Sequence, residues 1–159
     1  MVTRPLPLIL LLTSPLAAQV PGHWRLASEP DLPTRIERAA ASVRPEARER
    51  ARVELRRNNP VPRSLTIAHG DGYISIAFDG SRPQRMPESG LAVPWTREDG
   101  QKYMISARFK GRTLVHTLMG EDGMRETLYR VEKGRLIQRV TVKAMVLAKP
   151  FTYTVAYRP

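Results

Sequence analysis

Residues 102–144 read KYMISARFKGRTLVHTLMGEDGMRETLYRVEKGRLIQRVTVKA, and apolar and polar side chains alternate through most of this stretch. A period of two is typical of β-strands that bury one face. The alternation is interrupted where a charged residue precedes a glycine, at Lys110-Gly111, Asp122-Gly123 and Lys133-Gly134. Such dipeptides are typical of tight turns between antiparallel strands. The stretch therefore predicts short antiparallel strands that follow one another as a meander.

The same pattern begins at Arg63 and continues to Arg158, with further turn signals at Asp71-Gly72, Asp79-Gly80 and Asp99-Gly100. A turn about every ten residues predicts an up-and-down antiparallel sheet of about seven to ten strands. Residues 81–95 are rich in proline, so we expect a loop or an irregular edge strand there. Closing the sheet into a barrel would hide its apolar face and its edges together.

Before the sheet, residues 34–57 show a helical pattern, preceded by a brief extended segment at 23–26. Small and apolar residues recur at three- and four-residue spacing on one face: Ile36, Ala40, Val43, Ala47, Ala51 and Leu55. Thr34 and Glu37 fit a capping box at the start. Pro45 is best placed in a first helical turn, so we expect a helix–turn–helix that breaks near Val43. These helices could cover one open end of the barrel.

The first eighteen residues have the pattern of a secretory signal peptide. Arg4 precedes an apolar run over Leu6–Leu12, and the small pair Ala17-Ala18 follows. The run is shorter than the roughly 20 residues that span a bilayer, which argues against an anchor. Cleavage after Ala18 would reduce 159 residues to 141, and the loss of Arg4 would lower the net charge from +11 to +10. We expect an exported chain, in a periplasm or outside the cell, that forms one domain from residue 19 to 159.

Composition narrows the possible chemistry. The chain contains no cysteine, which excludes disulfides, thiolate metal sites and a cysteine nucleophile. Its three histidines lie far apart, and its aspartates sit in or beside glycine turns, where they are favoured for structural reasons. No spacing recommends a catalytic triad or a metal-binding motif. The sequence therefore predicts a non-enzymatic protein with neither cofactor nor metal.

The order of strand, helix–turn–helix and meander resembles the calycin superfamily, which includes lipocalins and fatty-acid-binding proteins. Gly22-His23-Trp24 resembles the Gly-x-Trp opening of these proteins. Residues 111–116, Gly-Arg-Thr-Leu-Val-His, with the following Asp122-Gly123, are similar to a late hairpin of fatty-acid-binding proteins. The signal peptide points to secreted bacterial lipocalin-like domains as the nearer relatives. The resemblance implies a mainly β barrel that binds a small lipophilic ligand.

The resemblance also implies a place for a ligand carboxylate. Fatty-acid-binding proteins hold it with two interior arginines and a tyrosine near the C-terminus. Arg130 and Tyr157 match two of these, but Val155 stands where the second arginine would be, so the clamp is incomplete. If Tyr129 and Val131 face inward, Arg130 faces solvent, and a register change of one residue decides between the two arrangements.

The residue pattern itself adds further candidates for the interior. His116 lies between Leu114 and Leu118, and Gln138 lies on a face with Leu136 and Val140. Either could contact a ligand in a cavity or be a hydrogen-bonded core residue. The predicted ligand-binding set combines both lines of reasoning: His116, Arg130, Gln138, Phe151, Tyr153 and Tyr157.

Two functions remain open at this point. The first is a monomeric, exported module that binds a small apolar ligand. The second is an envelope structural or interaction protein whose barrel is filled and whose basic surface binds anionic lipids. Export argues against a nucleic-acid partner. A continuous void of several hundred Å³ would favour the first function, and a filled core would favour the second.

Overall fold

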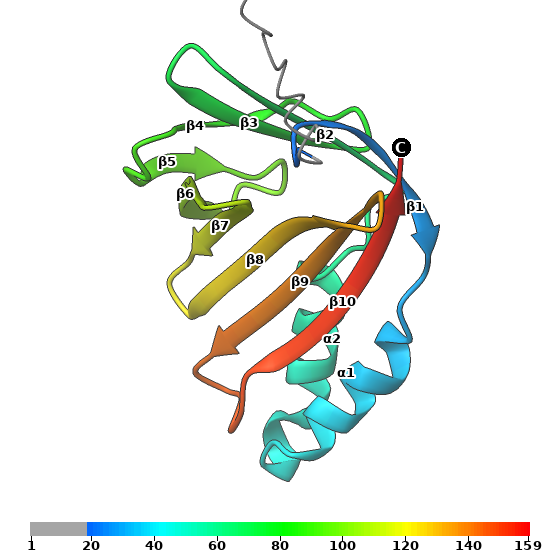
Figure 1. Cartoon of the computed structure of the whole chain (residues 1–159). Helices are drawn as coiled ribbons and strands as arrows, with labels where there is room; N and C mark the ends of the chain where they lie inside the picture. The colour runs from blue at the N-terminus through cyan, green and yellow to red at the C-terminus, as the bar shows by residue number, and fades with distance from the viewer. Residues whose placement is uncertain (1–18) are drawn as a thin grey trace, which may run out of the picture.

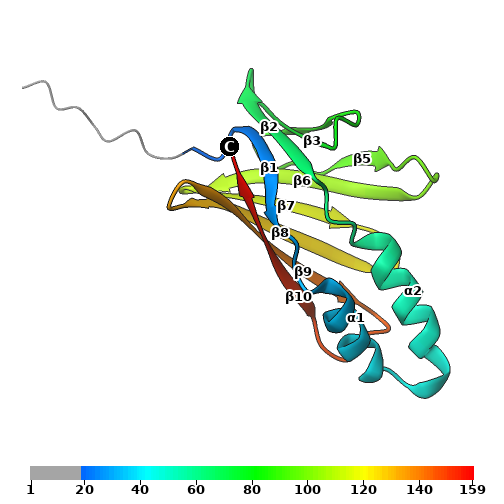
Figure 2. The ribbon, with the colours of Figure 1, turned by 90° about the vertical axis from the view of Figure 1, so that its right-hand side faces the viewer.

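Ten antiparallel strands form one sheet that curls into a nearly closed barrel (Figures 1 and 2). The computed structural model describes residues 19–159, so the predicted signal peptide lies outside the described residues. The strands are β1 (Gly22–Ser28), β2 (Ser64–Gly70), β3 (Tyr73–Phe78), β4 (Gln84–Pro87), β5 (Val93–Thr96), β6 (Lys102–Lys110), β7 (Thr113–Met119), β8 (Gly123–Glu132), β9 (Arg135–Ala144) and β10 (Phe151–Arg158). The predicted mainly β, antiparallel meander is confirmed.

The first strand joins the two halves of the sheet. The strand order is β4-β3-β2-β1-β10-β9-β8-β7-β6-β5, in which β1 pairs with both β2 and β10. The edges are β4 and β5, four residues each, and in the described sheet they do not pair with each other. They come from the proline-rich residues 81–95, which were expected to form a loop or a poor edge strand. Proline suits an edge because it cannot donate a ladder hydrogen bond.

Several of the predicted turns have the backbone geometry that their residues favour. Asp71-Gly72, Asp79-Gly80 and Lys133-Gly134 all have positive φ at both residues. This pairing matches the right-handed twist of the flanking strands in a two-residue hairpin. Glycine at the second position adopts it without a steric cost. The turn signals thus set the register that places alternate side chains inside the barrel.

The helical segment forms α1 (Leu32–Ala41), a short 3₁₀ turn η1 (Pro45–Ala47) and α2 (Arg48–Asn58). The break before Pro45 is confirmed, but the predicted capping box is wrong. Asp31 is the N-cap, and its Oδ1 accepts from the Thr34 backbone N–H at 3.4 Å. Glu37 instead crosses to α2, where it pairs with Arg52 and Arg56, each at 2.8 Å.

The two helices lie side by side at the end of the barrel opposite the described N-terminus (Figure 2). Ile36 and Ala40 of α1 and Ala51 and Leu55 of α2 are buried, as their spacing predicted. Inside the barrel, the largest fully buried side chains include Tyr129 and Tyr157. Among residues 19–159, no helix is both long enough and apolar enough to span a membrane.

Candidate functional site

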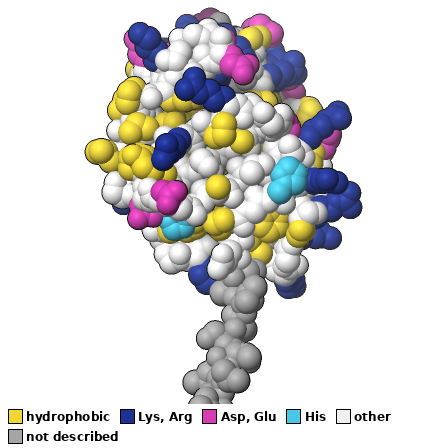
Figure 3. All heavy atoms as spheres, turned by 90° about the horizontal axis from the view of Figure 1, so that it is seen from above, with side chains coloured by type: hydrophobic (Ala, Val, Ile, Leu, Met, Phe, Trp, Pro, Cys, Tyr) yellow, Lys and Arg dark blue, Asp and Glu magenta, His cyan; other side chains and the backbone are white. Residues whose placement is uncertain are grey.

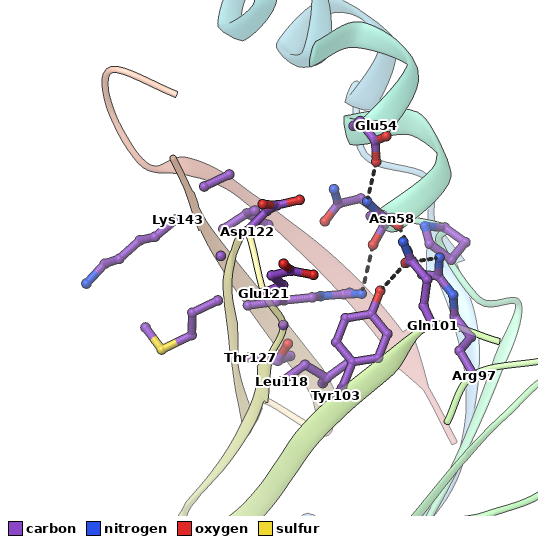
Figure 4. Close-up of a pocket in the computed structure, with 18 of the residues that line it drawn as sticks. Glu54, Asn58, Arg97, Gln101, Tyr103, Leu118, Glu121, Asp122, Thr127 and Lys143 are labelled. Atoms are coloured by element: carbon purple, nitrogen blue, oxygen red, sulfur yellow. Dashed lines mark hydrogen bonds between the residues drawn. The ribbon is translucent and has the colours of Figure 1, made fainter. Parts of the chain in front are cut away.

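A cavity of about 870 Å³ opens beneath α2 on the inner side of the sheet (Figure 4). Its apolar lining includes Ala51 from α2, Leu118 from β7 and Val142 from β9. Its polar lining includes Asn58 from α2, Gln84 from β4, His116 from β7, and Arg125, Thr127 and Tyr129 from β8. A concave, largely apolar space with a few converging polar groups is the usual form of a small-molecule site.

The end of α2 is tied to two walls of this cavity through Asn58. Arg97 Nη1 donates to Asn58 Oδ1 at 3.0 Å, from the turn between β5 and β6. Arg125 Nη1 donates to the Asn58 carbonyl at 3.4 Å, from β8. Figure 4 shows Asn58 between these strands and Glu54, whose carboxylate accepts from the Asn58 amide at 3.1 Å. The position of α2 over the cavity therefore depends on polar contacts at its last turn.

Arg97 is itself held in place by its neighbours in the β5–β6 turn. Its guanidinium donates to both carboxylate oxygens of Asp99, at 2.9 and 2.6 Å, and to Gln101 Oε1 at 2.7 Å. These hydrogen bonds from Arg97 lower the pKa of Asp99 to about 2. Tyr103 donates to the same Gln101 oxygen at 2.6 Å. The turn thus presents a preorganised cation to the end of α2.

Deeper in the barrel, three side chains form a linear chain of hydrogen bonds. Tyr157 donates its hydroxyl to Gln138 Oε1 at 3.1 Å, and Gln138 Nε2 donates to the Tyr129 hydroxyl at 3.3 Å. Burial raises the pKa of Tyr129 to about 12 and raises that of Tyr157 as well. Both hydroxyls therefore stay protonated at neutral pH. Of the three, only Tyr129 reaches the cavity wall; Gln138 and Tyr157 belong to the core behind it.

Within the described chain, three buried polar atoms have no hydrogen-bond partner: Gln84 Oε1, His116 Nε2 and Arg125 Nε. All three residues line the cavity. Burial, reinforced by the nearby charge of Arg125, lowers the pKa of His116 to about 3, so its imidazole is neutral at ordinary pH. Buried polar groups in native proteins almost always have partners. The three residues line the cavity through other atoms, because the unpartnered atoms themselves are buried.

The structure places the six predicted ligand-binding residues in four different environments. His116 lines the cavity, while Gln138 and Tyr157 form the core network. Phe151 and Tyr153 are buried on β10, with ring centroids 5.6 Å apart, behind the cavity wall. The Tyr153 hydroxyl reaches toward the cavity, because it accepts from Arg125 Nη2 at 3.2 Å.

Arg130 is the exception, and its predicted interior position is wrong. Its side chain is 64% exposed on the outer face of β8, with Nε 3.7 Å from Glu132. Tyr129 faces inward, so the register is the one in which Arg130 faces solvent. Val155 is buried on β10, opposite Gln138. Neither position of the expected carboxylate clamp supplies an interior cation.

Arg125 is the cation that the sequence analysis missed. It lies four residues before Tyr129 on β8 and therefore shares the inner face with Thr127 and Tyr129. The signal was present in the alternation, but the resemblance directed attention to Arg130. Within residues 19–159, no carboxylate lies within 4.0 Å of the Arg125 guanidinium.

No protein-family model matches the chain, and no curated protein matches it significantly in sequence. Solved structures do match its fold. A REP1-NXSQ fatty acid transporter is 17% identical, with 87% of this chain and 94% of that chain covered and a TM-score of 0.56. A secretory abundant heat soluble protein from Ramazzottius varieornatus is 10% identical, with 91% and 98% covered and a TM-score of 0.59. Human cRBP IV is 16% identical, with 89% and 98% covered and a TM-score of 0.53.

These likenesses establish the fold. The chain is a calycin-like β-barrel, as its order of elements predicted. The closer relationship to secreted bacterial lipocalin-like domains stays a prediction.

Proposed function

We propose that this chain is an exported, non-enzymatic protein that binds a lipophilic small molecule in the cavity beneath α2. The observation that carries the proposal is the cavity itself, about 870 Å³ in volume. This volume falls within the range of roughly 300–1,000 Å³ that small-ligand sites occupy. Apolar side chains such as Leu118 and Val142 would contact the body of the ligand.

The structural neighbours support the same class of function. They include a fatty acid transporter and a lipid binding protein from Caenorhabditis elegans, the second with a TM-score of 0.54. Export is supported by the apolar run over Leu6–Leu12 and by Ala17-Ala18. If this signal is cleaved, N-terminal sequencing of protein from the envelope or the medium should begin near Gln19, and a mature chain that still starts at Met1 would contradict export.

The alternative function required a filled barrel and a basic working surface. A cavity of about 870 Å³ argues against a filled barrel. Lys and Arg side chains are spread around the rim of the face shown in Figure 3, with apolar and acidic side chains among them. The helical residues 34–57 carry eight arginines, but also four glutamates, and Glu37 and Glu49 pair with Arg52. Ligand binding in the cavity is therefore the function that the geometry supports best.

A cavity-filling variant tests the proposal directly. The purified protein should bind a fluorescent lipophilic probe, such as anilinonaphthalene sulfonate, and lipids extracted from native-host protein should be identifiable by mass spectrometry. Leu118→Trp should block the cavity and abolish saturable probe binding (Figure 4). Leu128→Trp, on the outer face of β8, is the matched control and should bind as the wild type does. A Leu118→Trp protein that folds and binds the probe normally would overturn the proposal.

A further inference from the structure

Four of the six methionines of the chain gather around the turn between β7 and β8. Met119 ends β7, and Met124 is the second residue of β8. Met119 pairs with Met104 of β6 on one side and with Met124 on the other. Met145 follows the end of β9, and its backbone N–H donates to the Asp122 carbonyl at 3.1 Å. Segments that belong to four neighbouring strands thus bring their thioethers to one turn.

These side chains lie at the surface and not in the barrel core. Leu118 lines the cavity from β7, so its neighbour Met119 faces outward, and the register places Met104 and Met124 on the same face. Met104, Met119 and Met145 are 42%, 55% and 86% exposed. Single exposed apolar residues are ordinary, but a contiguous group of them indicates a binding surface.

Three of the four side chains, Met119, Met124 and Met145, line one shallow groove on the surface. Met124 and Met145 also reach the rim of the cavity beneath α2, so the groove adjoins that cavity. The backbone beside the groove is tightly packed, because a Cβ at Gly123 would collide with the carbonyl oxygen of Lys143. This close approach of β8 to β9 fixes the backbone from which the three thioethers project.

The ligand atoms in this groove suit a soft cation. Thioether sulfur is a neutral, polarizable ligand that selects Cu(I), whereas carboxylate and carbonyl oxygens suit harder ions. Glu121 and Lys143 also line the groove, and their opposite charges leave it without a net charge. Among residues 19–159, no group of three or more His, Asp or Glu side chains could hold a metal ion. The sequence predicted no metal from nitrogen, oxygen and thiolate ligands, and thioether sulfur is a different class of ligand.

We propose that Met119, Met124 and Met145 form a thioether site for a soft monovalent cation, Cu(I) or its analogue Ag(I). Directly opposed residues on antiparallel strands have Cβ atoms roughly 4.5–5.5 Å apart, and methionine has a long, flexible side chain. The sulfur atoms of Met119 and Met124 can therefore converge on one ion, and Met145 supplies the third ligand. Met104 is a fourth thioether beside Met119. The site goes beyond the proposed function and does not depend on a ligand in the cavity.

Titration of the purified protein with silver nitrate in chloride-free buffer tests the site. The chain has no cysteine, so a thiolate cannot account for bound Ag(I). At about pH 5.5 most exposed imidazoles are protonated, whereas a thioether does not titrate. Calorimetry should show about one ion per chain, and the methyl NMR signals of Met119, Met124 and Met145 should shift. Cu(I), kept reduced by ascorbate, should shift the same signals, and excess Zn(II) should not displace Ag(I). Displacement by Zn(II), or unshifted methyl signals, would overturn the proposal.

Leucine variants separate a metal site from an apolar contact surface, because leucine keeps the volume of methionine and removes its sulfur. Met119→Leu/Met124→Leu should weaken Ag(I) binding about tenfold or more, and Met145→Leu should also weaken it. Met86→Leu, at a methionine buried on β4, is the matched control and should keep the wild-type affinity. Circular dichroism checks that each variant folds.

A Met119→Leu/Met124→Leu protein that folds and binds Ag(I) as the wild type does would overturn the proposal, and the exposed methionines would then be an apolar contact surface. The titrations contain no lipophile, so their failure leaves the proposed function standing. A protein that binds no lipophile but binds Ag(I) through these methionines would contradict the proposed function alone.

Discussion

His116 is a histidine whose surroundings keep it uncharged. It is 1% exposed, and burial together with Arg125 lowers its pKa to about 3 from the usual 6.5. The unfolded chain therefore takes up a proton below pH 6.5 that the folded chain excludes. Since the folded pKa is the lower one, the stability is fully present above pH 6.5 and is lost as the pH falls toward 3.

This difference predicts a steep pH dependence of folding. Between pH 6 and pH 4, the free energy of unfolding of the wild type should fall by about 1.4 kcal/mol per pH unit more than that of His116→Gln. Urea unfolding at several pH values measures the slope. His23→Gln, at an exposed histidine, is the control and should follow the wild type. Parallel curves for the wild type and His116→Gln would show that His116 is not buried as described.

Gln138 is the residue on which the core network depends, because it bonds both Tyr129 and Tyr157. Gln138→Leu would leave two buried hydroxyls without this partner, so we expect a loss of roughly 2–4 kcal/mol in the free energy of unfolding. The double variant Gln138→Leu/Tyr157→Phe should recover part of that loss, since it removes one of the two buried hydroxyls that lack a partner. Chemical denaturation compares the two, and a double variant less stable than the single one would argue against the network.

At the residue scale, alternation predicted much of the interior. His116, Gln138, Tyr153 and Tyr157 all point inward, as their apolar neighbours on the same face indicated. Periodicity could not predict which of them lines a cavity, because that depends on how far each side chain reaches across the barrel. Arg125 was missed because an arginine in an alternating strand is ordinarily exposed, and only the final register identifies it as an inward residue.

Among the elements, α1 shows how a cap can be misassigned from a short motif. Asp31 and Thr34 are both good N-cap types, and the pattern Thr34–Glu37 favoured Thr34. In the structure the helix already begins at Leu32, with Pro33 in its first turn, where proline fits well. This leaves Asp31 as the capping residue and frees Glu37 to join α1 to α2.

The two capping assignments predict opposite results. Asp31→Ala should lower the free energy of unfolding by about 0.5–1 kcal/mol, because it removes the acceptor of the Thr34 N–H. Thr34→Ala should change it by less than about 0.5 kcal/mol. Thermal or urea unfolding of the two variants shows which residue caps α1. A larger loss for Thr34→Ala than for Asp31→Ala would restore the capping box.

The strands were more predictable than the cap, because their signals are repeated and reinforce one another. Asp71-Gly72 and Asp79-Gly80 each supply the turn that their neighbouring strands require. The proline-rich residues 81–95 were expected to form a loop or an irregular edge strand, and the edge strand is what the structure has. The sequence could not show that this segment would supply both edges, β4 and β5, because that depends on how far the sheet curls before its ends meet.

In the whole molecule, the cavity exists because the helices cover the end of the barrel without filling it. The inward stripe of the helical segment is rich in alanine, and its small side chains Ala47 and Ala51 line the cavity without filling it. The last turn of α2 is then fixed by two arginines, Arg97 from the β5–β6 turn and Arg125 from β8, both bonded to Asn58. The contacts of Asn58 therefore set the position of α2 over the cavity.

This coupling predicts that Arg97 controls ligand exchange more than affinity. Arg97→Ala removes the contact at 3.0 Å to Asn58 without deleting an apolar contact of the cavity floor. If a ligand passes the end of α2, weakening that contact should speed both entry and release. We expect release to accelerate by about three- to tenfold, the effect of one hydrogen bond, while the dissociation constant changes less. Stopped-flow dilution of the bound fluorescent probe measures the rate.

Two variants make the result specific to this contact. Asn58→Ala removes the same hydrogen bond from the other side and should accelerate release to a similar extent. Arg85→Ala removes an arginine that stacks on Tyr73, 3.9 Å from the ring centre and on strands β4 and β3, and should leave release unchanged. If Arg97→Ala and Arg85→Ala release the probe at the same rate, the ligand does not leave past the end of α2, and the route would have to lie elsewhere, with the unpaired edges of β4 and β5 as the next place to look.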